Sequence, residues 1–378
     1  MNIGILTQPL GNNYGGLLQN YALQETLRRM GHNPITLDQY IHHKTLWWIL
    51  VSTIECLIKN VCRLILGRQL QSIPYVICRK QSVVAKPMEC FIENYIKRTP
   101  KVFGFSGTRK LTEALDLNAI IVGSDQVWRK NMNSRIFTNF LDFAQGLSLL
   151  KVAYSASIGV DIWEYDEQET FRIKNLLLKF NAISVRERSA QLLLNKKIKI
   201  DSKFTLDPTL LLEAKDYEKI IDHGQTIKSS GKIFAYILDD SSNKREILKS
   251  VENRLGLNSY TITPYGLNSN KQCSSVEQWL RSFMDADFVV CDSFHGCVFS
   301  IIFRKPFIAI ANTQRGNTRF DSLFQMFDIK ERLVEKTTDL DFDILHINWE
   351  DVESKLKDMQ LLSLDFLKNS LNEYVRIL

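Results

Sequence analysis

Short apolar runs alternate with longer stretches of helical periodicity along this chain. The apolar runs lie at 3–7, 35–37, 119–122, 152–155, 182–185, 233–238, 260–263, 288–291 and 307–310. Between most of them, apolar residues recur every three or four positions, as on one face of a helix. Strands that alternate with helices are typical of parallel sheets covered by helices on both faces. The pattern therefore predicts an α/β protein.

The runs fall into two sets, and each set predicts one parallel sheet. Runs up to Val185 form the first set, and runs from Ile233 form the second. Pro208 lies between them in the segment Leu206-Asp207-Pro208-Thr209, where proline interrupts both strand and helix. We therefore expect an N-terminal domain over 1–208, a C-terminal domain over 209–345, and a helical segment over 346–378. The length of 378 residues agrees with roughly two to three domains.

Residues 45–67 form an apolar stretch that stands apart from this alternation. As a helix it would be apolar nearly all round, with one charged stripe made by Glu55, Lys59 and Arg63. Trp47 and Trp48 at one end, with basic residues further on, are typical of a helix that lies in a membrane interface. The alternative, which we favour, is a core helix or part of a helical insertion near 45–98. If the protein touches a membrane, we expect the contact at 45–67 and only at the surface.

Composition and charge narrow the classes of function. Lys and Arg number 48 against 42 Asp and Glu, a net charge of +6, which favours anionic ligands but not nucleic acid. The seven cysteines are odd in number and include no CxxC pair, so we expect free thiols in a reducing cytoplasm. The start of the chain lacks a basic leader, and no apolar stretch is long enough to span a membrane. No spacing of ligand residues predicts a metal site.

Two polar segments follow predicted strands in the N-terminal half. The first is the turn Gly11-Asn12-Asn13-Tyr14-Gly15-Gly16, where glycines permit close backbone approach and the next helix offers free N–H groups. The second is Gly123-Ser124-Asp125-Gln126-Val127-Trp128, at the strand end where α/β proteins bind ligands. A carboxylate, an amide and an indole together suit a sugar. A plain turn, a helix cap at Asp125 and a core position for Trp128 are the alternatives.

Two further segments carry groups that suit an anion. Arg186 and Arg188 stand just past the strand at 182–185, and a guanidinium binds phosphate or carboxylate in a bidentate manner. A surface Arg–Glu pair is the alternative. The segment Asp292-Ser293-Phe294-His295-Gly296 then follows the strand at 288–291 and opens a predicted helix. Its imidazole, carboxylate, Ser hydroxyl and helix amides can do acid–base work, and the alternative is a helix-capping histidine.

These motifs together resemble the polysaccharide pyruvyl transferase family. The resemblance is carried, in the expected order, by the Asn-Asn-Tyr-Gly-Gly turn, Val-Gly-Ser-Asp-Gln-Val-Trp, Ser-Val-Arg-Glu, Leu-Asp-Pro-Thr-Leu-Leu and Asp-Ser-Phe-His-Gly…Lys-Pro-Phe. It implies two Rossmann-like domains in a GT-B-like arrangement, with the active site in the interdomain cleft. The N-terminal domain would be the acceptor side and the C-terminal domain the donor side.

The resemblance also implies the chemistry. Phosphoenolpyruvate would be the co-substrate, and no cofactor would be required. The acceptor would be a sugar, either free of lipid or linked to one. The product would be a cyclic pyruvate ketal on a cell-surface polysaccharide precursor. His295 would be the general acid and either Asp125 or Asp292 the base. The expected donor-binding residues are Arg186, Ser293, Gly296, Arg315 and Arg319, and the expected acceptor-binding residues are Asn12, Asn13, Tyr14, Gly15, Ser124, Gln126 and Trp128.

One position departs from the family pattern. Many members carry Arg two residues before the motif His, where this chain has Ser293. We expect Arg315 or Arg319, after the strand at 307–310, to supply the missing cation near His295. Two other functions share these residues: a GT-B glycosyltransferase that uses a nucleotide sugar, and a non-catalytic scaffold of glycan assembly. Donor binding distinguishes the three.

Overall fold

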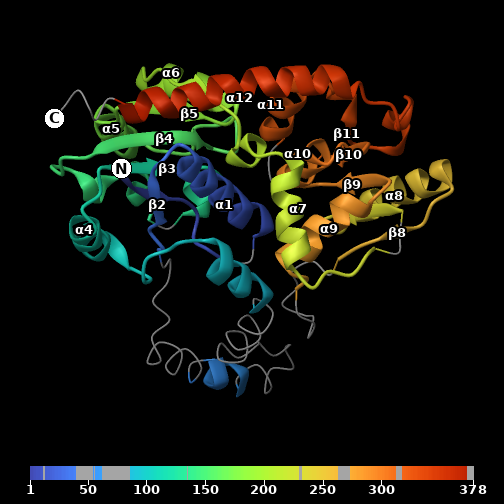
Figure 1. The fold of residues 1–378 in the computed structure, drawn as a ribbon, viewed down its shortest axis with the longest axis horizontal. Coiled ribbons are helices and arrows are strands. Elements are labelled where there is room, and N and C mark those ends of the chain that lie inside the picture. Colours follow the sequence, from blue (N-terminus) through green and yellow to red (C-terminus); the bar gives the residue numbers. More distant parts are fainter. Residues whose placement is uncertain are drawn as a thin grey trace.

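A computed structural model describes residues 1–11, 13–39, 54, 56–61, 86–133, 135–229, 232–262, 273–311 and 317–372. These residues form two lobes side by side, each built on one parallel sheet (Figure 1). The predicted sites Asn12 and Arg315, and most of the apolar stretch 45–67, lie outside the described residues.

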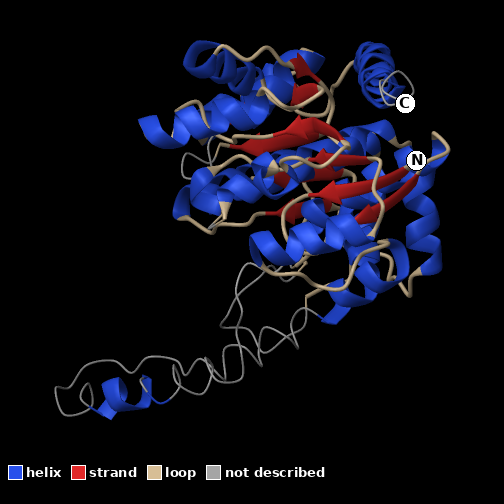
Figure 2. Cartoon of the chain, turned by 90° about the vertical axis from the view of Figure 1, so that its left-hand side faces the viewer, coloured by secondary structure: helices blue, strands red, loops and turns tan. Residues whose placement is uncertain are grey.

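The first lobe holds a six-stranded parallel sheet in the order β2-β1-β3-β4-β5-β6. Helices cover both of its faces (Figure 2). The strands are β1 (Asn2–Leu6), β2 (Asn33–Thr36), β3 (Ala119–Val122), β4 (Leu150–Ala156), β5 (Ala182–Val185) and β6 (Lys203–Phe204), and the helices are α1 (Tyr14–Arg29), α4 (Gly104–Ala114), α5 (Glu167–Leu177) and α6 (Arg188–Ile198).

The second lobe holds a five-stranded parallel sheet in the order β11-β10-β9-β7-β8. Its strands are β7 (Ile233–Tyr236), β8 (Ser259–Tyr260), β9 (Phe288–Cys291), β10 (Phe307–Ile310) and β11 (Leu333–Val334), and its helices are α7 (Ala214–His223), α8 (Ser242–Leu255), α9 (Val276–Asp285), α10 (Phe294–Ile302) and α11 (Thr318–Phe327). The chain leaves the first sheet after Phe204 and enters the second at Ile233, a stretch that includes the expected boundary at 208.

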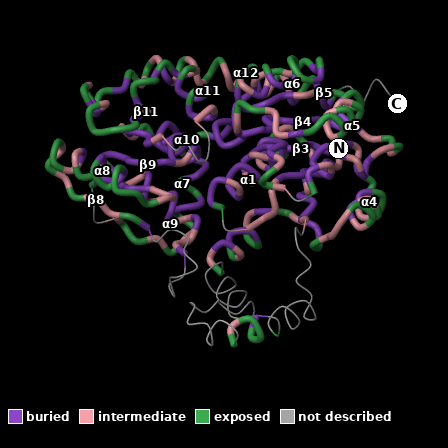
Figure 3. The backbone as a smooth tube through the Cα atoms, turned by 180° about the vertical axis from the view of Figure 1, so that it is seen from behind, coloured by how far each residue is buried: buried purple, intermediate pink, exposed green. Residues whose placement is uncertain are grey.

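The predicted strands are present, and several bounds coincide with the apolar runs. Every residue of β3, β9 and β10 is buried, because helices cover both faces of each sheet, whereas only the second half of β5 is buried (Figure 3). The pattern missed β6 and β11, which have two residues each and are too short to show as apolar runs. It also placed Gly15 and Gly16 in a turn, whereas α1 begins at Tyr14 and includes both.

The two lobes share one hydrophobic core. A single cluster of buried apolar side chains runs from Ile3 and Leu18 in the first lobe to Trp279 and Phe299 in the second. Tyr14, at the start of α1, stacks on Trp279 with ring centres 5.3 Å apart and donates its hydroxyl to the carbonyl of Ser274. The first turn of α1 is therefore packed into the second lobe.

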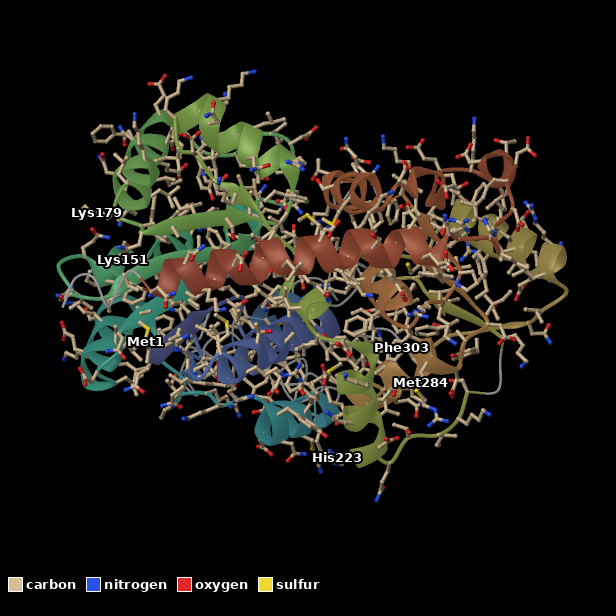
Figure 4. All side chains as sticks on the ribbon, turned by 45° about the horizontal axis from the view of Figure 1, so that its top comes forward. Met1, Lys151, Lys179, His223, Met284 and Phe303 are labelled. Atoms are coloured by element: carbon tan, nitrogen blue, oxygen red, sulfur yellow. The ribbon has the colours of Figure 1, made fainter. Side chains whose placement is uncertain are left out.

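The last helix, α12 (Trp349–Asn372), returns from the second lobe to the first. It lies across both lobes, with Phe303 of the second lobe near one part of it and Lys151 of the first near the other (Figure 4). Ser363 accepts a hydrogen bond from the amide of Leu206, and the ring of Phe366 lies 6.2 Å from that of Tyr154 on β4. The helix expected within 346–378 thus packs on β4 of the first lobe and on α11 of the second.

Part of the expected insertion near 45–98 is described. A helix at 86–95 packs on α1, where the ring of Tyr21 lies 6.2 Å from that of Phe91 and 6.0 Å from that of Tyr95. The predicted contact of residues 45–67 with a membrane concerns mostly residues outside the described ranges. None of the described helices is both long enough and apolar enough to cross a membrane.

Candidate functional site

A cavity of about 430 Å³ lies between the two lobes. Its wall is built from the loops that follow β3 and β9 and from the first turn of α1. Asn13, Gly15 and Asp125 line it from the first lobe, and His295 and Arg319 line it from the second. Parallel sheets gather the residues after their strands at one edge, which is where α/β folds bind ligands. The cavity brings together residues that are far apart in the sequence.

His295 lies in the first turn of α10, between the lobes. Ser293 caps this helix and accepts a hydrogen bond from the amide of Gly296 at 3.4 Å. A Cβ added to Gly15 would lie 2.0 Å from Nδ1 of His295, so the ring needs a glycine on α1. A Cβ on Gly296 would lie 2.8 Å from Cβ of Cys291, so this second glycine lets the helix pack on β9. His295 is 7% exposed and lines the cavity.

Arg186 is paired with two carboxylates through its two terminal nitrogens. One of its terminal nitrogens donates to Asp207 at 2.6 Å, and the other donates to Asp125 at 3.3 Å. The ring of Phe294 lies under the guanidinium, 4.4 Å from its central carbon. Arg186 is 3% exposed and does not line the cavity. Its neighbour Arg188 is exposed and lies over the ring of Phe204, so only the first of the two arginines faces inward.

These charges set the protonation of both carboxyl groups. Burial raises the pKa of Asp125, but the nearby charges of Arg186 and His295 outweigh it and hold the pKa below its usual range. Burial likewise opposes the ionisation of Asp207, yet His295, Arg186 and Thr209 lower its pKa far below that range. The same pairs raise the pKa of Arg186 in spite of its burial. Both carboxylates therefore stay charged at neutral pH.

Among the described residues that line the cavity, Arg319 is the one arginine or lysine. It belongs to α11, is 8% exposed and lines the cavity with His295. Burial and the nearby charge of Arg186 lower the pKa of its guanidinium to about 10, although Asp125 and Glu187 act in the opposite direction. An anion in the cavity would offset this unfavourable environment. Arg319 thus has the position expected of the cation that substitutes for the arginine absent at 293.

Asp292 is held by groups of its own lobe. Its oxygens accept hydrogen bonds from the amides of Leu238 and Asp239 at 2.7 and 3.2 Å and from Lys244 at 2.6 Å. Both predicted bases line the cavity. Asp125 accepts hydrogen bonds from the amide of Gln126, from Arg186 and, at 3.4 Å, from the side chain of Asn13. The choice between Asp125 and Asp292 as the base stays a prediction.

Three predicted acceptor residues do not face the cavity. The indole of Trp128 is 1% exposed, stacks on Phe140 and donates to the carbonyl of Asn139, so it belongs to the core and cannot cover a sugar ring. Ser124 is fully buried, with its hydroxyl within 3.0 Å of Asp207. Tyr14 is taken up by its contacts with the second lobe.

Of the other predicted acceptor residues, Asn13, Gly15 and Gln126 line the cavity. Among the described residues, no group of three or more His, Cys, Asp or Glu is arranged to hold a metal ion.

Two charged residues of this region were not predicted, Asp207 and Lys244. Asp207 lies in the segment that we interpreted as a linker, and Lys244 is an ordinary lysine of α8. The sequence did contain a signal for Asp207. An aspartate within an otherwise apolar run is expected to be buried, and a buried carboxylate needs charged or hydrogen-bonding partners. Lys244 carries no such signal, since only the fold brings it to Asp292.

The model of the polysaccharide pyruvyl transferase family matches residues 13–314. The chain belongs to this family. Family membership makes it a transferase, and the matched range includes Asp125, Arg186, Asp207 and His295. A comparison with curated protein sequences found no match.

Solved structures of similar fold have very different sequences. S. aureus MnaA in complex with UDP superposes with a TM-score of 0.52 at 10% identity, covering 100% of this chain and 98% of that chain. The apo form of UGT2 from Phytolacca americana gives 0.52 at 9% identity, covering 99% and 100%. At such identities the likeness concerns the fold alone. This chain of the pyruvyl transferase family has a two-domain, GT-B-like α/β fold.

Proposed function

We propose that this protein transfers the pyruvyl group of phosphoenolpyruvate to two hydroxyls of a sugar and so forms a cyclic ketal on a polysaccharide precursor. Family membership supports pyruvyl transfer in general. The observation that carries the proposal is the cavity between the lobes, where a histidine, a carboxylate and a buried arginine face one space. This is the set of groups that the reaction needs: an acid, a base and a counter-charge for an anionic donor.

The steps follow from the chemistry of the donor. His295 gives a proton to the methylene carbon, and positive charge develops on the carbon that carries the phosphate. A sugar hydroxyl attacks that carbon and gives its proton to Asp125. The bond from carbon to the phosphate oxygen then breaks and phosphate leaves. The second hydroxyl adds to the same carbon and gives its proton to the neutral His295, which closes the ketal and restores the acid. Arg319 and the amides at the start of α10 bind the anionic groups of the donor.

The test is a phosphate-release assay with phosphoenolpyruvate and a panel of lipid-linked and nucleotide-linked sugars. We expect phosphate release only with an acceptor, together with a product whose mass has increased by one pyruvate less one water. His295→Ala should lower turnover by ~10²–10⁴-fold with the fold intact. Calorimetry with nucleotide sugars is the counter-test. If these bind in the cavity and phosphoenolpyruvate does not, the protein is a glycosyltransferase; if neither binds, it is a scaffold.

A further inference from the structure

Asp207 is a buried carboxylate with a fixed orientation. It is 1% exposed and caps the 3₁₀ turn at Pro208–Leu211. Its Oδ1 accepts hydrogen bonds from the amide and the hydroxyl of Thr209 at 3.1 and 2.7 Å. Its Oδ2 lies 3.0 Å from the hydroxyl of Ser124 and accepts from Arg186 at 2.6 Å. With four groups around it, this carboxylate cannot turn.

His295 faces this carboxylate with one edge of its ring. Its Nε2 lies 3.7 Å from Oδ2 of Asp207 and, among the described residues, has no hydrogen-bond partner. The other ring nitrogen, Nδ1, lies beside Gly15, which lines the cavity. The two nitrogens therefore have different surroundings: Nε2 faces a fixed negative charge, and Nδ1 lies against Gly15, a residue without a side chain that lines the cavity.

Other charged groups also act on the ring. Asp125 lies close enough for its ionisation to depend on His295, and Arg186 joins Asp125 to Asp207. Arg319 lines the same cavity from α11, and Asp292 lines it as a pair with Lys244. Of the carboxylates in this group, Asp207 is the one within 4 Å of a ring nitrogen of His295. Its charge is therefore best placed to favour a proton on Nε2.

Given the proposed function, we propose that Asp207 is a positioning residue for His295. It holds the Nε2 edge of the ring and balances the charge of the imidazolium, so that Nδ1 is the nitrogen that gives its proton to the substrate. Neutral His295 then keeps its remaining proton on Nε2. Gly15 places no side chain over Nδ1.

The first test uses the unmutated protein and does not depend on turnover. Long-range ¹H–¹⁵N spectra of protein labelled at histidine show which ring nitrogen retains the proton at high pH, and the signal of His295 is the one lost in His295→Gln. We expect the Nε2–H form. A proton on Nδ1 would overturn the proposal, whether or not the protein uses phosphoenolpyruvate.

The second test compares Asp207→Asn with Asp38→Asn. Asp38 is another buried carboxylate paired with an arginine, Arg98 at 2.9 Å, and is outside the cavity. Asp207→Asn should lower kcat tenfold to a hundredfold, leave KM for phosphoenolpyruvate within about twofold, and move the basic limb of the pH–rate profile to lower pH. Asp38→Asn should lower stability only. If Asp207→Asn folds and its pH–rate profile is unchanged, Asp207 has only a structural role and does not position His295.

If the unmutated protein does not turn over phosphoenolpyruvate, the proposed function fails. The position of the proton on His295 in the first test still decides the role of Asp207.

Discussion

At the scale of single residues, the site depends on which charges are already paired. Arg186 and Arg319 are both buried, but they differ in what surrounds them. The two terminal nitrogens of Arg186 bind carboxylates, whereas Arg319 sits in a place that lowers its pKa and faces the cavity. An arginine whose charge is disfavoured by burial gains most from a bound anion. Of the two arginines, we therefore expect Arg319 to contribute more to donor binding.

We predict opposite effects for methionine at these two arginines. Arg319→Met should weaken phosphoenolpyruvate binding roughly tenfold to a hundredfold, the value of a charge-assisted bond, while the melting temperature stays the same or rises. Arg186→Met leaves two buried carboxylates without their cation and should cost about 3–5 kcal/mol of stability. Calorimetry and thermal melting measure both effects. Loss of stability in Arg319→Met with unchanged binding would return the donor role to Arg186.

A second residue-scale prediction concerns Gly15. Alanine is a better helix former than glycine by about 0.5–1 kcal/mol, but at 15 its Cβ would collide with His295. Gly15→Ala should therefore lower both stability and turnover, the latter at least tenfold. Gly107→Ala is the matched control, since it lies in α4 with no atom within 4 Å of the added Cβ, and it should raise stability. Full activity of Gly15→Ala would mean that the lobes adjust freely at this contact.

Whether a site residue could be predicted from the sequence depends on how far apart along the chain the interacting residues lie. His295 and Asp125 were predicted because each follows an apolar strand within a few residues, a local signal. Asp207 was not predicted. It meets Arg186 because the short strand β6 pairs with β5, and it meets His295 only because the two lobes lie together. Trp128 was wrongly assigned to ligand binding for a similar reason. An indole after a strand fits a core as well as a pocket, and here Phe140 packs against it.

At the scale of elements, the site is made where α1 and α10 begin. Both helices follow short loops after strands, and both present their first turn to the cavity. In α10 the first turn is closed by Ser293, so one hydroxyl both caps the helix and lines the cavity. The chain thus has a helix cap at the position where many family members carry arginine.

Ser293→Ala tests this double use. Loss of the cap should cost about 1 kcal/mol. Ser275→Ala provides the control, because Ser275 caps α9 by the same bond, from the amide of Gln278 at 3.1 Å, and does not line the cavity. Melting temperatures should fall alike in both variants, and only Ser293→Ala should weaken phosphoenolpyruvate binding. Equal donor affinity in the two would assign Ser293 to the helix alone.

Elements were predicted well where burial is uniform. Strands with helices on both faces appear as continuous apolar runs, which is why β3, β9 and β10 were found with their bounds. The start of α1 was misplaced because two glycines usually indicate a turn. Here they are helical, and Gly15 is required by a side chain of the other lobe rather than by its own backbone.

At the scale of the whole molecule, the lobes are joined by more than a linker. One hydrophobic core passes through both, Tyr14 of the first lobe is stacked on Trp279 of the second, and α12 packs on each. The order of apolar runs predicted two sheets but not this joint core, because contacts between lobes leave no periodic signal.

The joint core predicts cooperative unfolding. Scanning calorimetry should show one thermal transition, with calorimetric and van't Hoff enthalpies in agreement. Tyr14→Leu, which removes the stacking and the bond to Ser274, should lower the temperature of that transition without dividing it. Two resolved transitions in the unmutated protein would show that the lobes are independent units.

The path of α12 has a consequence for how the protein is made. The chain begins in the first lobe with β1, builds the second lobe, and then returns to the first lobe with α12. During synthesis, the face of β4 that carries Tyr154 therefore stays without its partner Phe366 while the whole second lobe is translated. The first lobe is the first to be started, but it gains this cover only after the second lobe has been made.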